Sequence, residues 1–262
     1  NRSLCYCFLK ESIMNILLTN DDGYKASGIN QLFKSLSREH KVFLIAPREN
    51  CSGMSAAISL RKEIKVEESS QNIFVVSGTP ADCSYLGLLS VIPEPIDMIV
   101  SGINLGANLG EDIFYSGTVG AAIAGRRLNY VPVAFSVAAY NPKNLTYIAE
   151  QSLLITNQVS KLPSDQNLLV NVNFPDLSSS KIKGVQITSL GKRGAPDIPD
   201  LIRTEDTDKF YTFGPSGSLL PDQVGTDIQA IEQNYISISV LDYNLSADLV
   251  HSDLYREVFD CE

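Results

Sequence analysis

The chain has 262 residues, of which 44% are hydrophobic and 19% charged, and this composition excludes an intrinsically disordered protein. Its formal net charge of −9 argues against duplex nucleic acid as a partner, because an acidic surface repels the phosphate backbone. The five cysteines form no CxxC pair and no apolar run is as long as a membrane helix, so we expect a cytoplasmic protein with no membrane partner and no disulfide framework.

The first elements along the chain alternate between strand and helix. Residues 1–13 fit no element that follows, and we interpret them as an upstream extension outside the fold. Residues 15–19 are an apolar run typical of a strand buried on both faces of a parallel sheet, and residues 41–46 are a second such run. Between them, residues 28–38 have the apolar spacing of an amphipathic helix.

The alternation continues to about residue 180. We expect helices at 82–91, 118–128 and 145–162, and strands at 96–100, 132–137 and 167–173. Elements in this order predict right-handed βαβ crossovers and a mostly parallel sheet with helices on both faces. Residues 14–180 are therefore the predicted α/β core.

The last part of the chain, residues 181–262, has a different character. Strand-like segments at 182–190, 210–213 and 236–241 are separated by loops, and residues 191–207 are polar. These segments are too few to bury a core of their own. We expect a β-rich extension that packs with the core and serves as an oligomerisation arm.

The motif Asn20-Asp21-Asp22-Gly23 follows the first predicted strand. Ligands of parallel α/β sheets bind outside the carboxyl ends of the strands. Two adjacent carboxylates repel each other there, and a hard divalent cation that prefers oxygen ligands removes the repulsion. The same four residues are also favoured in ordinary turns, and this alternative stays open.

Three further segments belong to the same predicted edge of the sheet. Ser52-Gly53 follows the second strand, and the glycine-rich stretch at 101–112, with Asn104 and Asn108, follows a later one. Next come Ser116, Gly117 and Thr118, at a predicted helix N-terminus whose free N–H groups favour an anion. Capping of this helix by Ser116 or Thr118 is the structural alternative.

The remaining polar signals favour structure over chemistry. Thr79 and Pro80 are typical of the cap and first turn of a helix. Neither of the two histidines, His40 and His251, lies in a candidate motif, and we expect His40 to be solvated in a polar turn. A phosphohistidine or Ser-His-Asp mechanism is therefore not expected.

These motifs together resemble the survival-protein-E family over nearly the whole chain from Met14. The matching segments are 14–24, 46–53, 77–83 and 101–122, with weaker matches at 171–175 and 226–239. The resemblance implies a Rossmann-like three-layer fold with a C-terminal extension exchanged between subunits, in a homodimer or homotetramer. It also implies a metal-dependent phosphatase that hydrolyses nucleoside 5′- and 3′-monophosphates, with some action on short polyphosphate.

The family's metal ligands correspond to Asp21, Asp22, Ser52 and Asn104, which would hold one Mg²⁺ or Mn²⁺ per subunit. One departure is Ala56, where several relatives have Asn or His: its side chain cannot form a hydrogen bond.

Our mechanistic hypothesis is metal-assisted hydrolysis by a water molecule that Asp21, the expected catalytic residue, orients. We expect the substrate to contact six residues: Asn20, Gly23, Asn108, Ser116, Gly117 and Thr118. Direct attack by Asp21, which would give an aspartyl-phosphate, is the alternative.

Two other classes of protein compete with this interpretation. A dinucleotide oxidoreductase would have GxGxxG after the first strand, where this chain has Asn20 to Gly23. A non-enzymatic nucleotide-binding module would not need two adjacent carboxylates facing an anionic ligand.

Overall fold

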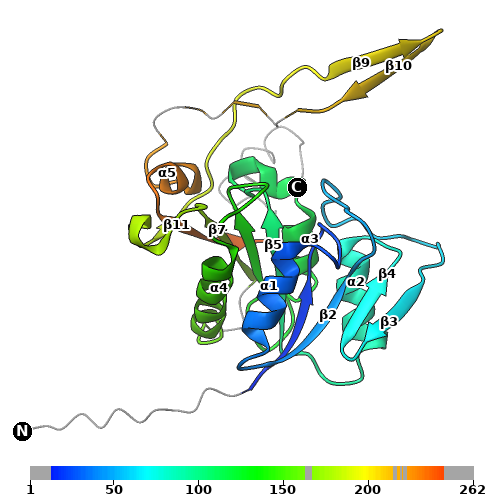
Figure 1. Cartoon of the computed structure of the whole chain (residues 1–262), viewed down its shortest axis with the longest axis vertical. Helices are drawn as coiled ribbons and strands as arrows, with labels where there is room; N and C mark the ends of the chain where they lie inside the picture. The colour runs from blue at the N-terminus through cyan, green and yellow to red at the C-terminus, as the bar shows by residue number, and fades with distance from the viewer. Residues whose placement is uncertain (1–12, 163–166, 215–216, 219, 221–222, 245–262) are drawn as a thin grey trace, which may run out of the picture.

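The computed structural model describes residues 13–162, 167–214, 217–218, 220 and 223–244, and its core is one large sheet (Figure 1). The sheet has nine strands in the order β3-β4-β2-β1-β5-β6-β7-β11-β8. In chain order these strands are β1 (Asn15–Thr19), β2 (Lys41–Pro47), β3 (Val66–Ser70), β4 (Ile73–Val76), β5 (Met98–Leu105), β6 (Val133–Val137), β7 (Leu168–Phe174), β8 (Val185–Thr188) and β11 (Ile236–Asp242).

The central part of the sheet is parallel, as the sequence predicts. Every neighbouring pair from β4 to β7 is parallel, whereas β3 pairs antiparallel with β4 and β11 pairs antiparallel with β7. In a parallel sheet all carboxyl ends of the strands meet at one edge. The loops after β1, β2 and β5 therefore lie close together.

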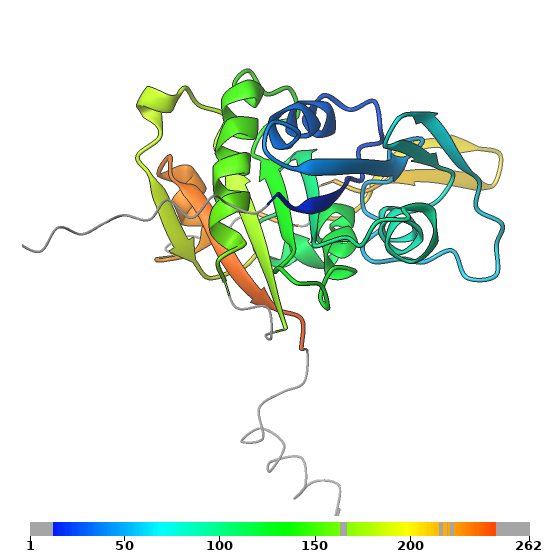
Figure 2. The same cartoon turned by 90° about the horizontal axis from the view of Figure 1, so that it is seen from below.

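Helices cover both faces of the sheet (Figure 2). Ile16 and Leu18 of β1 belong to a core cluster shared with the helices α1 (Ser27–Leu36) and α4 (Leu145–Val159). Leu17 points to the opposite face and packs in a second cluster with α2 (Pro80–Leu86). Side chains alternate along a strand, so one apolar strand supplies both interfaces. The predicted three-layer α/β architecture is confirmed.

Two helices have different bounds from those expected. Thr79 caps α2 through a hydrogen bond from the Asp82 backbone N–H, and Pro80 occupies the first turn, so this helix begins before residue 82. It ends at Leu86 and continues as a π-helical turn, η1 (Gly87–Val91). Helix α3 (Gly117–Ile123) is also shorter than predicted, and a 3-10 turn, η2 (Gly110–Phe114), precedes it.

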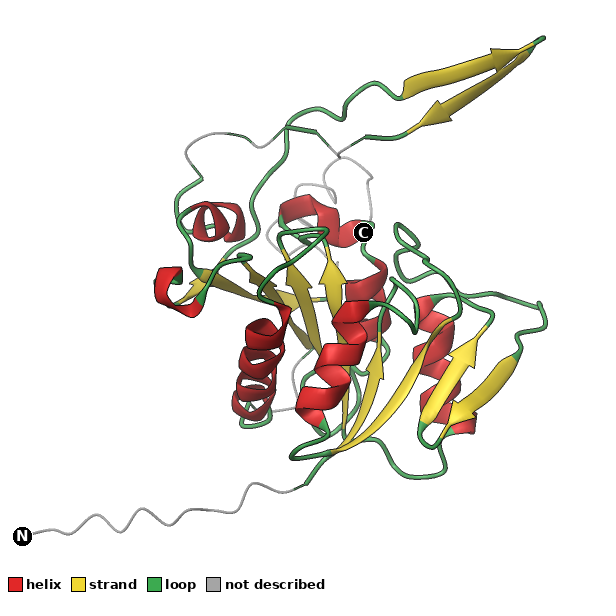
Figure 3. Ribbon diagram, viewed as in Figure 1, coloured by secondary structure: helices red, strands yellow, loops and turns green. Residues whose placement is uncertain are grey.

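The segment after residue 180 contributes to two sheets. Strands β8 and β11 extend the main sheet beyond β7, with a 3-10 turn, η3 (Ser179–Lys181), before β8 and the helix α5 (Asp227–Glu232) before β11. The strands β9 (Asp200–Glu205) and β10 (Asp208–Thr212) form a separate hairpin that projects from the body of the molecule (Figures 1 and 3). The sequence did not predict a strand at β9, because its two apolar residues are flanked by polar ones and the whole strand is exposed.

The prediction for His40 was wrong. This side chain is only 7% exposed, and its Nε2 lies 2.8 Å from Asn157 Oδ1 on α4. The imidazole joins the end of α1 to α4 and is buried by both, which the polar sequence around it does not reveal.

The described residues also bear on membrane helices and on the cysteines. Within them, no helix is both long and apolar enough to cross a membrane. Cys51 and Cys83 are free thiols.

Candidate functional site

The carboxylate pair lies directly after β1, at the carboxyl edge of the sheet. Asp21 is only 3% exposed, and its Oδ1 accepts a hydrogen bond of 2.6 Å from Thr118 Oγ1. Burial raises the pKa of Asp21 to about 6, and the Asp22 charge adds to this rise, while the bond from Thr118 opposes it. The ionised Asp21 carboxylate beside Asp22 is thus an electrostatic cost to the folded chain.

Asp22 joins the loops after β2 and β5. Its Oδ2 accepts a hydrogen bond of 2.9 Å from the Leu105 backbone N–H, and its Oδ1 lies 3.4 Å from Asn50 Nδ2. Burial also raises the pKa of Asp22, against the lowering effect of the bond from Leu105. Both carboxylates therefore face partners from distant parts of the sequence.

Ser52 lies in an exposed loop that is hydrogen-bonded to the segment containing Asp21 and Asp22. The Cys51 backbone N–H donates to the Asp21 carbonyl oxygen at 2.7 Å. The Ser52 backbone N–H donates to Asn50 Oδ1 at 2.8 Å, and the amide group of Asn50 in turn faces Asp22. The loop thus brings the Ser52 hydroxyl to the edge that carries the two carboxylates.

Asn104 is the second-to-last residue of β5 and is half-buried. Its Nδ2 donates to the Gly106 carbonyl oxygen at 2.8 Å, which leaves the side-chain oxygen for another partner. The next residue, Leu105, donates its backbone N–H to Asp22, so the end of β5 that carries Asn104 adjoins the carboxylate pair.

The start of α3 packs directly against Asp21. A Cβ atom at Gly117 would lie 2.9 Å from Asp21 Oδ2 and 2.8 Å from Asp21 Cβ, so only glycine fits there. Ser116 caps the helix by accepting from the Val119 backbone N–H at 3.1 Å, and its own N–H donates to the Ile113 carbonyl oxygen. The structural role predicted for Ser116 is confirmed, and Thr118 binds Asp21 instead of capping.

The other three predicted substrate residues have structural partners. Asn20 is buried, and its Nδ2 donates to the Gly23 carbonyl oxygen at 3.0 Å, which closes the turn. Gly23 has a φ of 96°, a conformation that favours glycine. Asn108 is also buried, and its Nδ2 donates to Ser136 Oγ at 2.8 Å, so this amide positions the loop after β5.

The sequence did not single out Asn50, although its amide lies between Asp22 and Ser52. Its position two residues before Ser52, in a loop after a buried strand, was the only available signal. The Leu105 contact could not be found from residue type, because the backbone N–H makes it.

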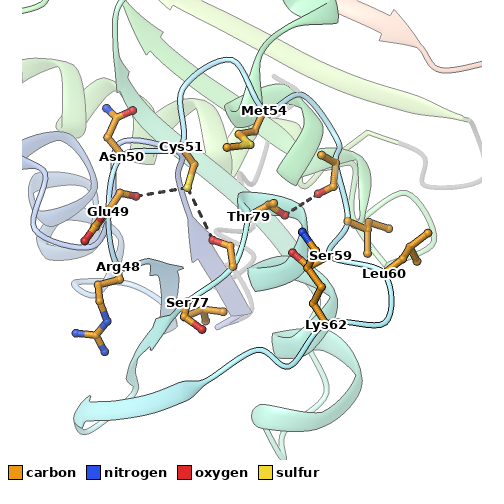
Figure 4. A pocket seen from close by; sticks show the side chains of 14 residues that line it. Arg48, Glu49, Asn50, Cys51, Met54, Ser59, Leu60, Lys62, Ser77 and Thr79 are labelled. Carbon is orange, nitrogen blue, oxygen red and sulfur yellow. Dashed lines mark hydrogen bonds between the residues drawn. The ribbon is translucent and has the colours of Figure 1, made fainter.

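An open pocket of about 810 Å³ adjoins this edge (Figure 4). Residues 48–51 form one wall and residues 59–62 the opposite wall, with Ser77 and Thr79 between them. Asn50 and Cys51 belong both to this wall and to the contacts with the carboxylate pair.

The ligand chemistry at this edge is that of oxygen. Within the described residues, no three His, Cys, Asp or Glu side chains lie together as a metal-binding group. Any cation would therefore depend on the two carboxylates plus hydroxyl and amide oxygens, as Ser52 and Asn104 supply. Such a set fits hard ions such as Mg²⁺ and Mn²⁺ better than Zn²⁺.

The fold and this edge define a Rossmann-like α/β protein with a carboxylate pair at the carboxyl ends of its parallel strands. The model of the family described as Survival protein SurE matches residues 16–197, and the chain belongs to this family.

Similar proteins agree with this assignment. A protein of Ruthia magnifica named 5′-nucleotidase SurE is 39% identical over 233 residues, which cover 89% of this chain and 94% of that protein. A protein of Wigglesworthia glossinidia brevipalpis named 5′/3′-nucleotidase SurE is 39% identical over 234 residues, covering 89% of this chain and 93% of that one. The crystal structure of the SurE protein from Aquifex aeolicus superposes with a TM-score of 0.79 at 32% identity, over 93% of this chain and 99% of that one.

Proposed function

We propose that this chain is a divalent-metal-dependent nucleotidase that hydrolyses nucleoside 5′- and 3′-monophosphates to nucleoside and phosphate. The names of its relatives support a nucleotidase, and the observation that carries the metal dependence is the adjacent pair of buried Asp21 and half-buried Asp22. Within the described residues, no Lys or Arg forms an ion pair with either carboxylate, so a cation that arrives with the substrate would relieve their repulsion.

Four side chains would hold one Mg²⁺ or Mn²⁺ ion: Asp21, Asp22, Ser52 and Asn104. A bound ion of this kind supplies Lewis acidity towards a phosphoryl oxygen and makes water more acidic. The contacts of Asn50 and Leu105 hold Asp22 in place for this role.

Asp21 would orient and deprotonate the attacking water. The Thr118 hydroxyl binds one of its oxygens and fixes the direction of the carboxylate. Because Gly117 has no side chain, the first turn of α3 comes close enough for its backbone N–H groups to face a phosphate beside Asp21. Attack of Asp21 itself on phosphorus is the competing route, and trapping of a phosphoenzyme would distinguish it.

The alternative of a non-enzymatic nucleotide-binding module has less support. A site that only binds an anion would be weakened by two adjacent carboxylates, whereas a hydrolase uses them for the ion and the water. The names of the relatives also favour an enzyme.

The decisive experiment is phosphate release from a panel of nucleoside 5′- and 3′-monophosphates and short polyphosphate, with Mg²⁺, Mn²⁺ or a chelator. We expect release from the nucleotides with either ion and none with the chelator. Tight nucleotide binding without any release, in the presence of either ion, would favour the binding module.

The C-terminal part is proposed to serve assembly into a homodimer or homotetramer. The β9–β10 hairpin exposes apolar side chains on a projecting arm that is too small to cover them: Leu201, Ile202 and Tyr211. A second copy of the chain would bury such surfaces. The free thiols of Cys51 and Cys83 support a location in the reducing cytoplasm.

A further inference from the structure

The pocket of about 810 Å³ between residues 48–51 and 59–62 is not used by the hydrolytic site described above. It is nevertheless connected to that site through two neighbouring residues. Asn50 lines the pocket and has its Nδ2 3.4 Å from Asp22 Oδ1, and Cys51 lines it and donates its backbone N–H to Asp21. A ligand that binds at the sheet edge with Asp21 and Asp22 could therefore extend its other groups into the adjoining pocket.

The wall that carries Ser59 and Leu60 is held in place by α2. Thr79 Oγ1 donates to the Ala57 carbonyl oxygen at 2.6 Å, and Asp82 Oδ1 accepts from the Ser59 backbone N–H at 3.0 Å. Asp82 Oδ2 also accepts from the Thr79 backbone N–H, so one carboxylate fixes both the helix cap and the loop. These bonds restrict the motion of the wall, and such restriction lowers the entropic cost of binding a ligand.

The lining combines apolar surface with a few polar groups. Met54, Ile58 and Leu60 line the pocket although they are exposed, and Leu60 is 76% exposed. The Ser77 and Thr79 hydroxyls already have partners in the chain, since Ser77 accepts from Lys65 and Thr79 donates to Ala57. Asn50 is also engaged, with Asp22 and Ser52, so a polar contact to a ligand would come from Lys62.

Such a lining fits a flat, mostly apolar group with polar atoms along its edge. Small-molecule sites typically have about 300–1,000 Å³ and a few placed polar groups among apolar ones. A purine or pyrimidine with its sugar matches this description, and it is joined to the phosphate that the carboxylate edge would take.

We propose that this pocket binds the nucleoside part of the substrate, with Met54, Ile58 and Leu60 against the base. This inference rests on the proposed nucleotidase function and adds to it the origin of selectivity for nucleotides over other phosphate monoesters. The residues that bind the nucleoside would then be different from Asp21, which takes part in the hydrolysis.

A competing position for the base lies on the other side of the carboxylates. The ring of Tyr140 is 82% exposed, and its Cε1 would be 3.3 Å from a Cβ atom at Gly106, close to Asn104. An exposed ring offers a base a single stacking face, whereas the open pocket offers the apolar side chains of Met54, Ile58 and Leu60 together. The pocket is therefore the site that we favour.

The test compares AMP with glycerol 2-phosphate, a monoester without a nucleoside. Leu60→Asp places a charge in the pocket and Ala57→Trp fills it, and both positions are exposed, so the fold should tolerate these changes. We expect the ratio of kcat/KM for AMP to that for glycerol 2-phosphate to fall about tenfold or more in each variant, as the loss of an apolar contact implies. Leu89→Asp is the matched control, because Leu89 is 79% exposed in η1 and does not line the pocket.

Adenosine provides a second measurement that needs no turnover. Its affinity, measured by calorimetry, should weaken in Leu60→Asp and Ala57→Trp but not in Leu89→Asp. An unchanged substrate ratio and adenosine affinity in both pocket variants would overturn the proposal, and so would a loss found in Tyr140→Ala instead. If the wild-type chain hydrolysed no nucleotide, the proposed function would fail, while the adenosine titration would still decide on the pocket.

Discussion

Replacing Asp21 by asparagine should abolish turnover and at the same time stabilise the metal-free protein. Folding moves the pKa of this carboxyl from 3.8 to about 6, mainly because the group is buried. Between these two pH values the unfolded chain loses its proton first, so ionisation favours the unfolded state, and stability is lost as the pH rises from about 4 to 6. The loss is complete above pH 6 and amounts to about 3 kcal/mol.

Asparagine is neutral and can still accept the hydrogen bond from Thr118, so it avoids this cost. The melting temperature of the metal-free variant at pH 7.5 should exceed that of the wild type by up to about 10 °C, and the difference should shrink towards zero at pH 4. In the presence of Mg²⁺ the difference in melting temperature should become smaller or change sign, because ion binding stabilises the wild type more strongly than the variant. The assay is a set of melting curves at several pH values, with and without chelator, beside specific activity.

Asp227→Asn is the matched control for this experiment. Asp227 is also buried with a raised pKa, caused mainly by burial, but its carboxylate accepts backbone N–H groups from Gly110, Gly191 and Ile228. An amide cannot accept all three equally well, so this variant should melt at a lower temperature than the wild type. A metal-free Asp21→Asn protein that is no more stable than the wild type at pH 7.5 would refute the electrostatic reasoning, and activity within a few-fold of wild type would exclude Asp21 from the mechanism.

Three further outcomes are expected. Exhaustive chelation should remove all activity, and Mg²⁺ or Mn²⁺ should restore it; full turnover in metal-free protein would contradict the ligand set of oxygen atoms. Nucleoside monophosphates should be hydrolysed far faster than a bis-phosphodiester reporter, since one carboxylate pair offers no second metal site; comparable rates on both would indicate a nuclease-like centre. Deleting the hairpin at residues 198–214 should lower the mass found by light scattering while β8 and β11 keep the main sheet intact, and an unchanged mass would count against its role in assembly.

The core of the fold could be predicted because its signals are local. The apolar runs of β1 and β2 and the periodicity of α1 each indicate their own element, and the order of elements implies the parallel sheet. The edge strand β3 gave no such signal. β3 has the sequence VEESS and is largely exposed, so pairing with β4, and not its own composition, makes it a strand.

The sequence predicts the residues of the candidate site but not their contacts. Asp21, Asp22 and Ser52 follow buried strands and Asn104 lies near the end of β5, so the topology brings these segments to one edge. The Thr118 bond to Asp21 and the engagement of Asn108 with Ser136 depend on side-chain directions that no sequence pattern specifies. The role of His40 was missed for the same reason, since its partner Asn157 is 117 residues away.

The span of the contacts around the carboxylates also has a consequence for biosynthesis. Thr118 and Asp21 are 97 positions apart, and Leu105 and Asp22 are 83 apart, so neither bond can form before most of the parallel sheet has assembled. A nascent chain in which only the first strands and α1 have folded has the turn at residues 20–23. It lacks the partners, Thr118 and Leu105, that hold the two carboxylates in place. The candidate site is therefore assembled late in folding. During refolding from urea, recovery of catalysis should lag behind recovery of the helical circular dichroism signal.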